Sequence, residues 1–327
     1  MMVDKMDKKE LPLVSVIIPV YNGSNYIREA IDSALAQSYK NCEVIVINDG
    51  STDNGLTEKI ALSYGNKIRY FYKENGGVSS ALNFGIKQMK GIYFSWLSHD
   101  DRYYKDKIKK QIELLMPMQN ERGVALCEID SINQESKRIK GKSNKRFLQN
   151  GKAIEWTDAL MNLLKYGSFY GCGLLIPKVL LEECGLFREN LKFCQDYLMW
   201  ILLFLNKSTL VYTDEVLVSL RIHEGQLTQK GRSIYHRESI IVAENVIPRL
   251  AQISQKEHNY LYYYAKDITK YNNPSIFHQC MVVANQKKLF NIWQKLKLRV
   301  ILCYGYIRPG IRKIYYRLFR KMNTQSQ

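Results

Sequence analysis

Two adjacent carboxylates, Asp100 and Asp101, follow an apolar and aromatic run at residues 91–97, with only Ser98 and His99 between. The run has the length and composition of a buried strand, so the two acids are expected where that strand ends. Neighbouring carboxylates repel one another unless a cation lies between them or one takes up a proton, which makes the pair a candidate metal site. The alternative is that Asp100 caps a helix beginning near Tyr103 while Asp101 is solvated, and these residues alone do not separate the two interpretations.

Four predicted strands must position this pair. Runs rich in β-branched or aromatic residues occupy residues 13–19, 42–48, 68–72 and 93–97. Helical patterns lie between them, at residues 27–35, 54–64 and 78–89. Four strand units in about 90 residues predict an α/β fold with a doubly wound parallel sheet.

Polar residues follow each predicted strand, and ligands of such sheets bind beyond the carboxyl ends of the strands. The clusters are Tyr21 with Asn22, Asp49, residues 75–77, and the acidic pair. The chain has neither a G-x-G-x-x-G after its first strand nor a G-x-x-x-x-G-K-[ST] sequence. Carboxylates with a hard cation, Mg²⁺ or Mn²⁺, therefore remain as the means of holding a nucleotide diphosphate.

Four segments resemble, in order and spacing, the motifs of family-2 glycosyltransferases. They are SVIIPVYN at 15–22, VINDGSTD at 46–53, ENGGVSSALNFGI at 74–86 and SWLSHDD at 95–101, within a resemblance that covers residues 12–225. It implies the GT-A fold, an α/β fold with a doubly wound mixed sheet and flanking helices. It also implies a nucleotide-sugar donor, with a UDP-sugar expected, and a saccharide or lipid-linked saccharide acceptor. The product would be a bacterial-type surface polysaccharide such as a capsule or O-antigen.

The resemblance assigns roles to single residues. Donor-binding roles fall on Pro19, Tyr21, Asn22, Asp49 and Asp100. Pro19 and Tyr21 would line the base pocket, and Asp49 would hydrogen-bond to the base. Asp100 would touch the ribose or the sugar, and Asp101 would coordinate the Mg²⁺ or Mn²⁺ on the diphosphate.

The chain departs from the family motifs at two positions. Ser98 stands at the first position of the usual D-x-D-D motif, and Leu82 stands where the third motif usually has Arg. The first departure concerns how the donor sugar is held, and the second removes a polar contact with the donor.

Asp196 opens an intensely apolar helical stretch in the segment FCQDYLMW, residues 193–200. A lone Asp at such a place is usually a helix cap. Family-2 enzymes carry their catalytic base in an E-D or Q-D pair here, so the resemblance assigns Asp196 as the base for the acceptor hydroxyl. Since the diphosphate already activates the sugar, no covalent nucleophile is needed, and a single displacement with inversion is expected.

Arg221 and His223 lie in the segment RIHEGQ, residues 221–226, which resembles the terminal R-x-H segment of the family. The resemblance places Arg221 or His223 near the diphosphate or the metal. A surface His after an edge strand is the alternative, because imidazole is as often a hydrogen-bonding group of a loop as a ligand.

The net charge of +17 is concentrated near the end of the chain, where residues 284–327 contain eleven Lys or Arg and no Asp or Glu. Over residues 296–321 these cations alternate with apolar and aromatic residues, as in helices that lie in a membrane interface. We therefore expect peripheral contact with an anionic membrane, at the inner face of the plasma membrane. A solvated helical face packed on the catalytic domain is the alternative.

Seven Cys without a C-x-x-C pair favour a reducing compartment. The charged N-terminus and the short apolar runs indicate neither a signal peptide nor a membrane span, so a cytoplasmic protein is expected. The predicted organisation is an extension at 1–11, a GT-A catalytic domain at 12–226 and a helical, basic region at 227–327. The catalytic domain divides into a nucleotide-binding half, 12–101, and an acceptor half, 102–226.

Two other functions fit part of the sequence. A metal-dependent nucleotidyltransferase would share the sheet, the metal and the nucleotide, but the Q-D-Y-x-x-W and R-I-H segments argue against it. A basic nucleic-acid-binding protein would use the cationic tail but would leave the polar clusters at the strand ends unexplained. The transferase is preferred, with no nucleic acid as partner.

Overall fold

The computed structural model describes residues 11–118, 121–141, 148–225, 232–255, 258–269 and 273–302. The chain divides into two compact units. The first comprises Met1–Leu163 and Ser168–Ile234, and the second comprises Leu164–Gly167 and Tyr235–Gln327. The predicted boundary at residue 226 stays a prediction, and the predicted extension at 1–11 lies almost wholly outside the described residues.

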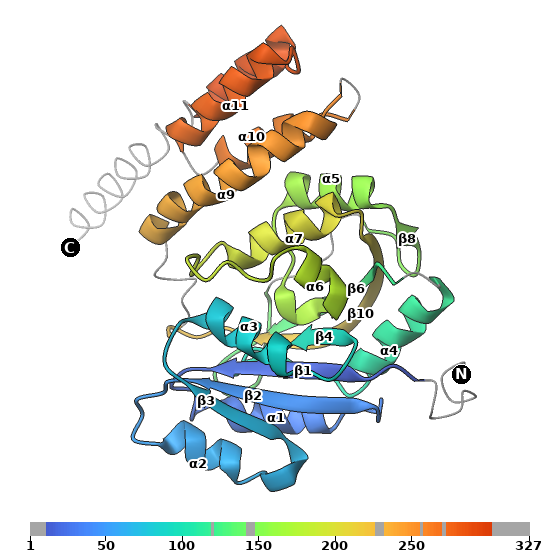
Figure 1. Cartoon of the computed structure of the whole chain (residues 1–327), viewed down its shortest axis with the longest axis vertical. Helices are drawn as coiled ribbons and strands as arrows, with labels where there is room; N and C mark the ends of the chain where they lie inside the picture. Colours follow the sequence, from blue (N-terminus) through green and yellow to red (C-terminus); the bar gives the residue numbers. More distant parts are fainter. Residues whose placement is uncertain are drawn as a thin grey trace, which may run out of the picture. The chain divides into compact units, whose positions relative to one another are not determined.

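The first unit begins with four parallel strands in the order β3-β2-β1-β4 (Figure 1). Their bounds are Val14–Val20 for β1, Cys42–Asp49 for β2, Arg69–Lys73 for β3 and Tyr93–Trp96 for β4. The connecting helices are α1 (Ile27–Leu35), α2 (Leu56–Leu62) and α3 (Val78–Gln88). These elements confirm the α/β alternation that the hydrophobic patterns predicted.

Helices cover both faces of this parallel sheet, which explains why every residue of β1 is buried and all but Ser15 are apolar. Val16 and Ile18 belong to the core cluster that contains Ile31 of α1. The intervening residue Ile17 points the other way and touches Gly85 of α3, where a Cβ atom would come within 2.6 Å of the Ile17 side chain. Figure 1 shows α1 and α2 on one side of the sheet and α3 on the other.

An antiparallel strand, β9 (Leu174–Pro177), joins this parallel half to the rest of the sheet. Beyond it lie β6 (Gly123–Ile132), then β10 (Thr209–Arg221) parallel to β6, then β5 (Arg102–Tyr103). Two short strands, β7 (Arg138–Ile139) and β8 (Ala153–Ile154), pair with β6 and β10. The described strands therefore form one mixed sheet, flanked by α4 (Lys107–Leu115), α5 (Trp156–Tyr166), α6 (Lys178–Glu183) and α7 (Gln195–Leu205).

The alternative interpretation, in which Asp100 caps a helix that begins near Tyr103, is wrong. Tyr103 lies in β5, where it pairs with Val218 of β10, and α4 begins only at Lys107. The phenol of Tyr103 also donates a hydrogen bond to the carbonyl of Trp96, which folds the chain back onto β4. Pairing with a strand more than a hundred residues away decided the conformation here, and no local pattern carries that information.

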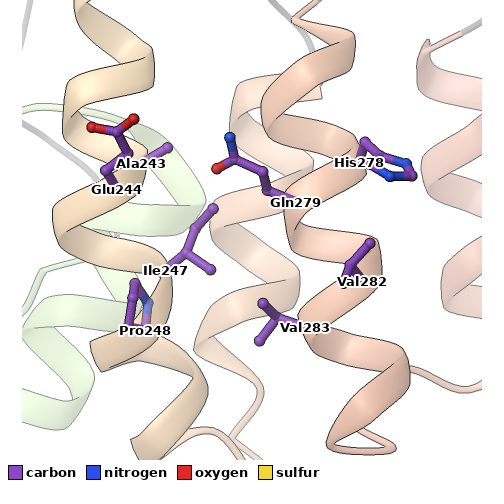
Figure 2. A pocket seen from close by; sticks show the side chains of 8 residues that line it. All are labelled: Ala243, Glu244, Ile247, Pro248, His278, Gln279, Val282 and Val283. Atoms are coloured by element: carbon purple, nitrogen blue, oxygen red, sulfur yellow. The ribbon is translucent and has the colours of Figure 1, made fainter.

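The described residues of the second unit are mainly helical. Its helices are α9 (Arg232–Ile253, whose first residues belong to the first unit), α10 (Tyr260–Thr269) and α11 (Pro274–Gln286), and residues 292–302 are also helical. A groove of about 290 Å³ runs between α9 and α11. Figure 2 shows Ile247 of α9 and Val283 of α11 directed into the space between the two helices. In the described part of the chain, no helix combines the length and apolarity that crossing a bilayer requires.

Lys107 is a fully buried cation in the first unit, at the start of α4. Its ammonium donates to Ser95 Oγ at 2.9 Å and to Gln111 Oε1 at 2.8 Å, and it lies 4.3 Å from the centre of the Tyr103 ring. These partners are uncharged, so burial lowers the pKa of Lys107 from its ordinary 10.5 to about 8.

This depressed pKa predicts a specific dependence of stability on pH. Between about pH 8 and pH 10.5 the unfolded chain binds the Lys107 proton and the folded chain does not, so the stability of the wild type should rise with pH across this window. The rise should amount to about 1.4 kcal/mol per unit of pKa difference. Thermal melts of wild type and Lys107→Met from pH 7 to 10 measure it, and identical pH profiles for the two proteins would contradict it.

Candidate active site

Asp49 ends β2 and is buried at the carboxyl edge of the sheet. Its Oδ1 accepts from the Lys73 ammonium at 2.7 Å and from the Gly76 N–H at 3.0 Å, and its Oδ2 accepts from the Gly77 N–H at 2.7 Å. Register explains the ion pair, since Asp49 and Lys73 are neighbours across β2 and β3. Asp49 thus orders the loop that follows β3, and a contact with a nucleotide base stays a prediction.

The loop after β1 is held by Asn22. Asn22 has a φ of 50°, and its side chain accepts from the Thr52 N–H at 2.7 Å and donates to the Thr52 hydroxyl at 3.3 Å. The loops after β1 and β2 are therefore tied together. The Tyr21 side chain is exposed beside this junction, whereas the Pro19 side chain is buried within β1. Of these three residues, the structure leaves the Tyr21 ring open to a ligand.

Asp101 is turned into the protein. Its Oδ1 accepts from the backbone N–H of Arg221 at 2.9 Å, and its Oδ2 accepts from the Cys172 thiol at 3.2 Å. Burial, with the neighbouring charge of Asp100, raises the pKa of Asp101 well above its ordinary value. Both oxygens of the predicted metal ligand are therefore engaged by protein donors, in surroundings that favour the protonated acid.

Asp100 is turned the other way and pairs with His223. His223 Nε2 lies 3.0 Å from Asp100 Oδ2, and the two side chains are 15% and 14% exposed. Burial alone would raise the pKa of Asp100, but the hydrogen bond from His223 and the charge of His99 bring it below its ordinary value. The site therefore presents one ionised carboxylate and one imidazole together at the end of the sheet.

Arg221 organises both aspartates from a fully buried position. Its Nε donates to the carbonyl of Asp100 at 2.8 Å, and its guanidinium lies over the Tyr26 ring, with Cζ 4.4 Å from the ring centre. Its terminal nitrogens donate to Glu29 of α1, to the carbonyls of Asn133 and Gln134, and to the hydroxyl of Ser136. Arg221 is therefore a positioning residue in this structure, and its direct contact with a donor stays a prediction.

Asp196 lies in the first turn of α7, partly exposed, with its Oδ1 accepting from the Tyr197 N–H at 2.6 Å. Burial raises the pKa of Asp196 to about 6. One turn further along α7, Trp200 packs beside Gly171, where a Cβ atom would come within 2.6 Å of the Trp96 ring and 3.4 Å of the Trp200 ring. Gly171 precedes Cys172, which is bonded to Asp101 in the turn that carries Asp100 and Asp101 (the acidic turn). Trp200 of α7 therefore packs beside a segment that contacts the acidic turn, and the role of Asp196 stays a prediction.

Comparison with known proteins identifies the family to which this site belongs. The sequence model of glycosyl transferase family 2 matches residues 15–176. An uncharacterized glycosyltransferase of Rickettsia typhi is 52% identical over 218 residues, which are 66% of each chain. TuaG of Bacillus subtilis, named for teichuronic acid biosynthesis, is 30% identical over 216 residues, which are 64% of this chain and 79% of TuaG. The chain belongs to glycosyltransferase family 2.

A solved structure of S. aureus TarS in complex with UDP-GlcNAc superposes with a TM-score of 0.63 at 21% identity, covering 79% of this chain and 72% of that chain. The mixed sheet and its flanking helices therefore have the GT-A type of fold, as the sequence motifs implied. The chain spans 66% of its Rickettsia typhi relative and 33% to 38% of three longer rickettsial relatives.

The fit of the family-2 site to a divalent cation can be examined from its side chains. Among the described residues, no group of three His, Cys, Asp or Glu side chains could hold a metal ion. Mg²⁺ and Mn²⁺ sites on nucleotides, however, use one or two protein groups and complete their coordination with phosphate oxygens. Adjacent ligands of an octahedral ion with bonds of about 2.1 Å lie about 3.0 Å apart. Asp100 Oδ2 and His223 Nε2, which share a hydrogen bond of 3.0 Å, have a separation compatible with this requirement. Both oxygens of Asp101 accept hydrogen bonds from protein donors, and its role as a metal ligand stays a prediction.

Sequence reasoning missed three residues that shape this family-2 site. Lys73 neutralises Asp49, Glu29 neutralises Arg221, and Cys172 donates to Asp101. Lys73 could have been predicted as a site residue, because it directly follows the predicted strand at residues 68–72. Glu29 and Cys172 carried no such signal, because both reach the site through contacts that are distant in the sequence.

The Arg221 network predicts a large stability effect. Arg221→Met leaves the Asp100 carbonyl and the loop carbonyls without their charged donor, so the free energy of unfolding should fall by about 3 kcal/mol or more. Glu29→Gln is the matched control, because a glutamine carbonyl still accepts from Arg221, and it should lose under half as much. Urea denaturation measures both, and equal losses would contradict the central role of the guanidinium.

Proposed function

We propose that this chain transfers a sugar from a nucleotide-diphosphate donor to an acceptor hydroxyl with inversion of the anomeric centre. The observation that carries the proposal is the pair of Asp100 and His223, held 3.0 Å apart at the carboxyl end of the sheet. The packing of Trp200, one turn beyond Asp196 on α7, beside Gly171 supports a position of Asp196 near the same turn. Membership of glycosyltransferase family 2 supports the class of reaction.

The proposed metal ligands are Asp100 and His223, in place of the Asp101 that the motif suggested. A bound Mg²⁺ or Mn²⁺ would stabilise the negative charge that grows on the leaving diphosphate. Asp100 would serve this role as a carboxylate, since its pKa is lowered, and His223 Nε2, which now contacts Asp100 Oδ2, would exchange that hydrogen bond for a bond to the cation. Asp101 keeps its bonds to Arg221 and Cys172 and orients the turn.

The proposed position of the donor is between this pair and the ends of β1, β2 and β3. The exposed ring of Tyr21 provides a face for stacking a base, and the loop ordered by Asp49 and Lys73 borders it. UDP is the expected nucleotide, since TarS of the same fold was crystallised with UDP and with UDP-GlcNAc. The relationship to TuaG supports a saccharide acceptor in the synthesis of a surface polysaccharide.

Asp196 is the proposed base. A carboxylate with a pKa of about 6 is ionised at neutral pH and is a stronger proton acceptor than an ordinary aspartate. It takes the proton of the acceptor hydroxyl while that oxygen attacks the anomeric carbon and the diphosphate leaves. The direct displacement inverts the anomeric centre. A screen of nucleotide-sugars tests the function, with nucleoside diphosphate as the expected product, and release of pyrophosphate instead would indicate a nucleotidyltransferase.

The metal assignment predicts different effects for the two neighbouring acids. Asp100→Asn and His223→Gln should each weaken Mn²⁺-dependent binding of UDP at least tenfold, because each removes one of two protein ligands. Asp101→Asn should weaken it less, since Asn can still accept from the Arg221 N–H. Calorimetry with and without Mn²⁺ measures these affinities, and a larger loss for Asp101→Asn than for Asp100→Asn would return the ligand role to Asp101.

The base assignment predicts a pH profile. Since only the ionised carboxylate accepts a proton, the turnover rate should fall about tenfold per unit below pH 6 and level off above pH 7. Asp196→Asn should lower the rate on the order of 10²- to 10⁴-fold and abolish this limb, with nucleotide affinity nearly unchanged. UDP affinity is measured at each pH as well. It shows whether a fall in rate comes from protonation of the proposed base or from weaker nucleotide binding at the proposed metal ligands. A variant that retains half of the wild-type rate would leave Asp196 with a structural role only.

A further inference from the structure

Residues 292–302 of the second unit form a helix with a well-defined start. Asn291 Oδ1 accepts from the Gln294 N–H at 2.8 Å, and Gln294 Oε1 accepts from the Asn291 N–H at 3.0 Å. This reciprocal pair is a capping box, which satisfies two backbone donors at the beginning of the helix. The Lys295 N–H then donates to the Asn291 carbonyl at 3.1 Å. The cap sets the rotation of the helix, and therefore which side chains share a face.

The exposed face of this helix is apolar. Ile292, Trp293, Leu296 and Val300 are 65%, 76%, 45% and 67% exposed, whereas Leu298 is fully buried. Because successive residues are rotated by about 100°, the four exposed side chains fall within a strip about 100° wide. We call these four residues the apolar strip. A solvated helical face would not gather its largest apolar side chains on its exposed side.

Cations border the apolar strip on both sides. On the same helical projection, Lys297 lies beside one edge, and Arg299 and Lys295 lie beside the other. Residues 284–327 contain no Asp or Glu that could neutralise them. An apolar strip between two cationic borders is the pattern of a helix that lies in the plane of a bilayer, where the long basic side chains reach outward to the lipid headgroups.

We propose that the apolar strip docks on an anionic lipid surface. Three side chains and the Trp293 ring would enter the boundary between headgroups and acyl chains, and Lys295, Lys297 and Arg299 would meet the lipid phosphates. Charge complementarity selects this occupant. A second copy of the strip would bring like charges face to face, and residues 303–327 carry further cations without a single acid, so neither supplies the anions that the borders require. The inference concerns the second unit alone and does not depend on the proposed catalytic site.

Co-sedimentation of the full chain with vesicles tests the proposal. The wild type should pellet with phosphatidylcholine vesicles that contain phosphatidylglycerol, should be released by high salt, and should stay in solution with pure phosphatidylcholine. Trp293→Gln with Leu296→Gln should lower the partition coefficient at least tenfold. Leu62→Gln is the matched control, because Leu62 is a 56% exposed residue of α2 in the first unit, and it should bind as the wild type does. Unchanged binding by the double variant would overturn the proposal.

A second pair of variants tests whether the cations beside the apolar strip contribute to lipid binding. Lys297→Gln with Arg299→Gln should weaken binding to anionic vesicles and reduce its dependence on salt, because two charges leave the interface. Lys59→Gln removes an exposed cation of α2 and should leave binding unchanged. Equal effects of the two changes would mean that net charge alone, and not the borders of the strip, drives the association.

Trp293 fluorescence places the contact at the strip. Subtracting the spectrum of Trp293→Phe from that of the wild type isolates Trp293 from the other three tryptophans. Anionic vesicles should shift this difference spectrum to the blue and protect it from iodide. Protection without vesicles would mean that another part of the chain or a second copy covers the strip, and light scattering would distinguish a dimer from a monomer. Either result would overturn the proposal.

Discussion

The candidate site depends on the burial of one guanidinium. A fully buried cation is costly unless every N–H group finds an acceptor, and Arg221 finds its acceptors on α1, in the loop at 133–136 and in the turn that carries Asp100. These three segments are far apart in the sequence, and the same residue holds them together. The geometry of the acidic turn is therefore set by the need to solvate Arg221 with protein groups.

The two aspartates of this turn have opposite environments although they are neighbours in the chain. Asp101 accepts from a backbone N–H and a thiol in a buried position, which raises its pKa, whereas Asp100 pairs with His223, which lowers its pKa. Two adjacent ionised carboxylates would repel one another, and this division removes the conflict by favouring the neutral form of one. The site can then keep a single ionised carboxylate beside the imidazole before any cation arrives.

The sequence predicted the nucleotide-binding half of the fold well, because its evidence is local. The β-branched run of β1 and the helical spacing of α1 are readable within a few residues, and the polar clusters at the strand ends followed from the parallel topology. The rest could not be read in this way. The short strand at Tyr103 exists because of pairing with β10, and the partner of Arg221 on α1 is 192 residues away. Sequence placed both aspartates and Arg221 at the site, but only the fold shows that Asp101 and Arg221 are bonded within the protein while Asp100 pairs with His223.

The antiparallel strand β9 explains how the two halves of the first unit share one site. It lies between β4 of the nucleotide-binding half and β6 of the acceptor half, and the turn before it carries Gly171 and Cys172. Cys172 bonds to the acidic turn after β4, while Gly171 leaves room for Trp200 of α7. A parallel strand at this place would put that turn at the opposite edge of the sheet. The reversal of one strand therefore lets the donor-side carboxylates and the helix that begins with Gln195 and Asp196 approach the same edge.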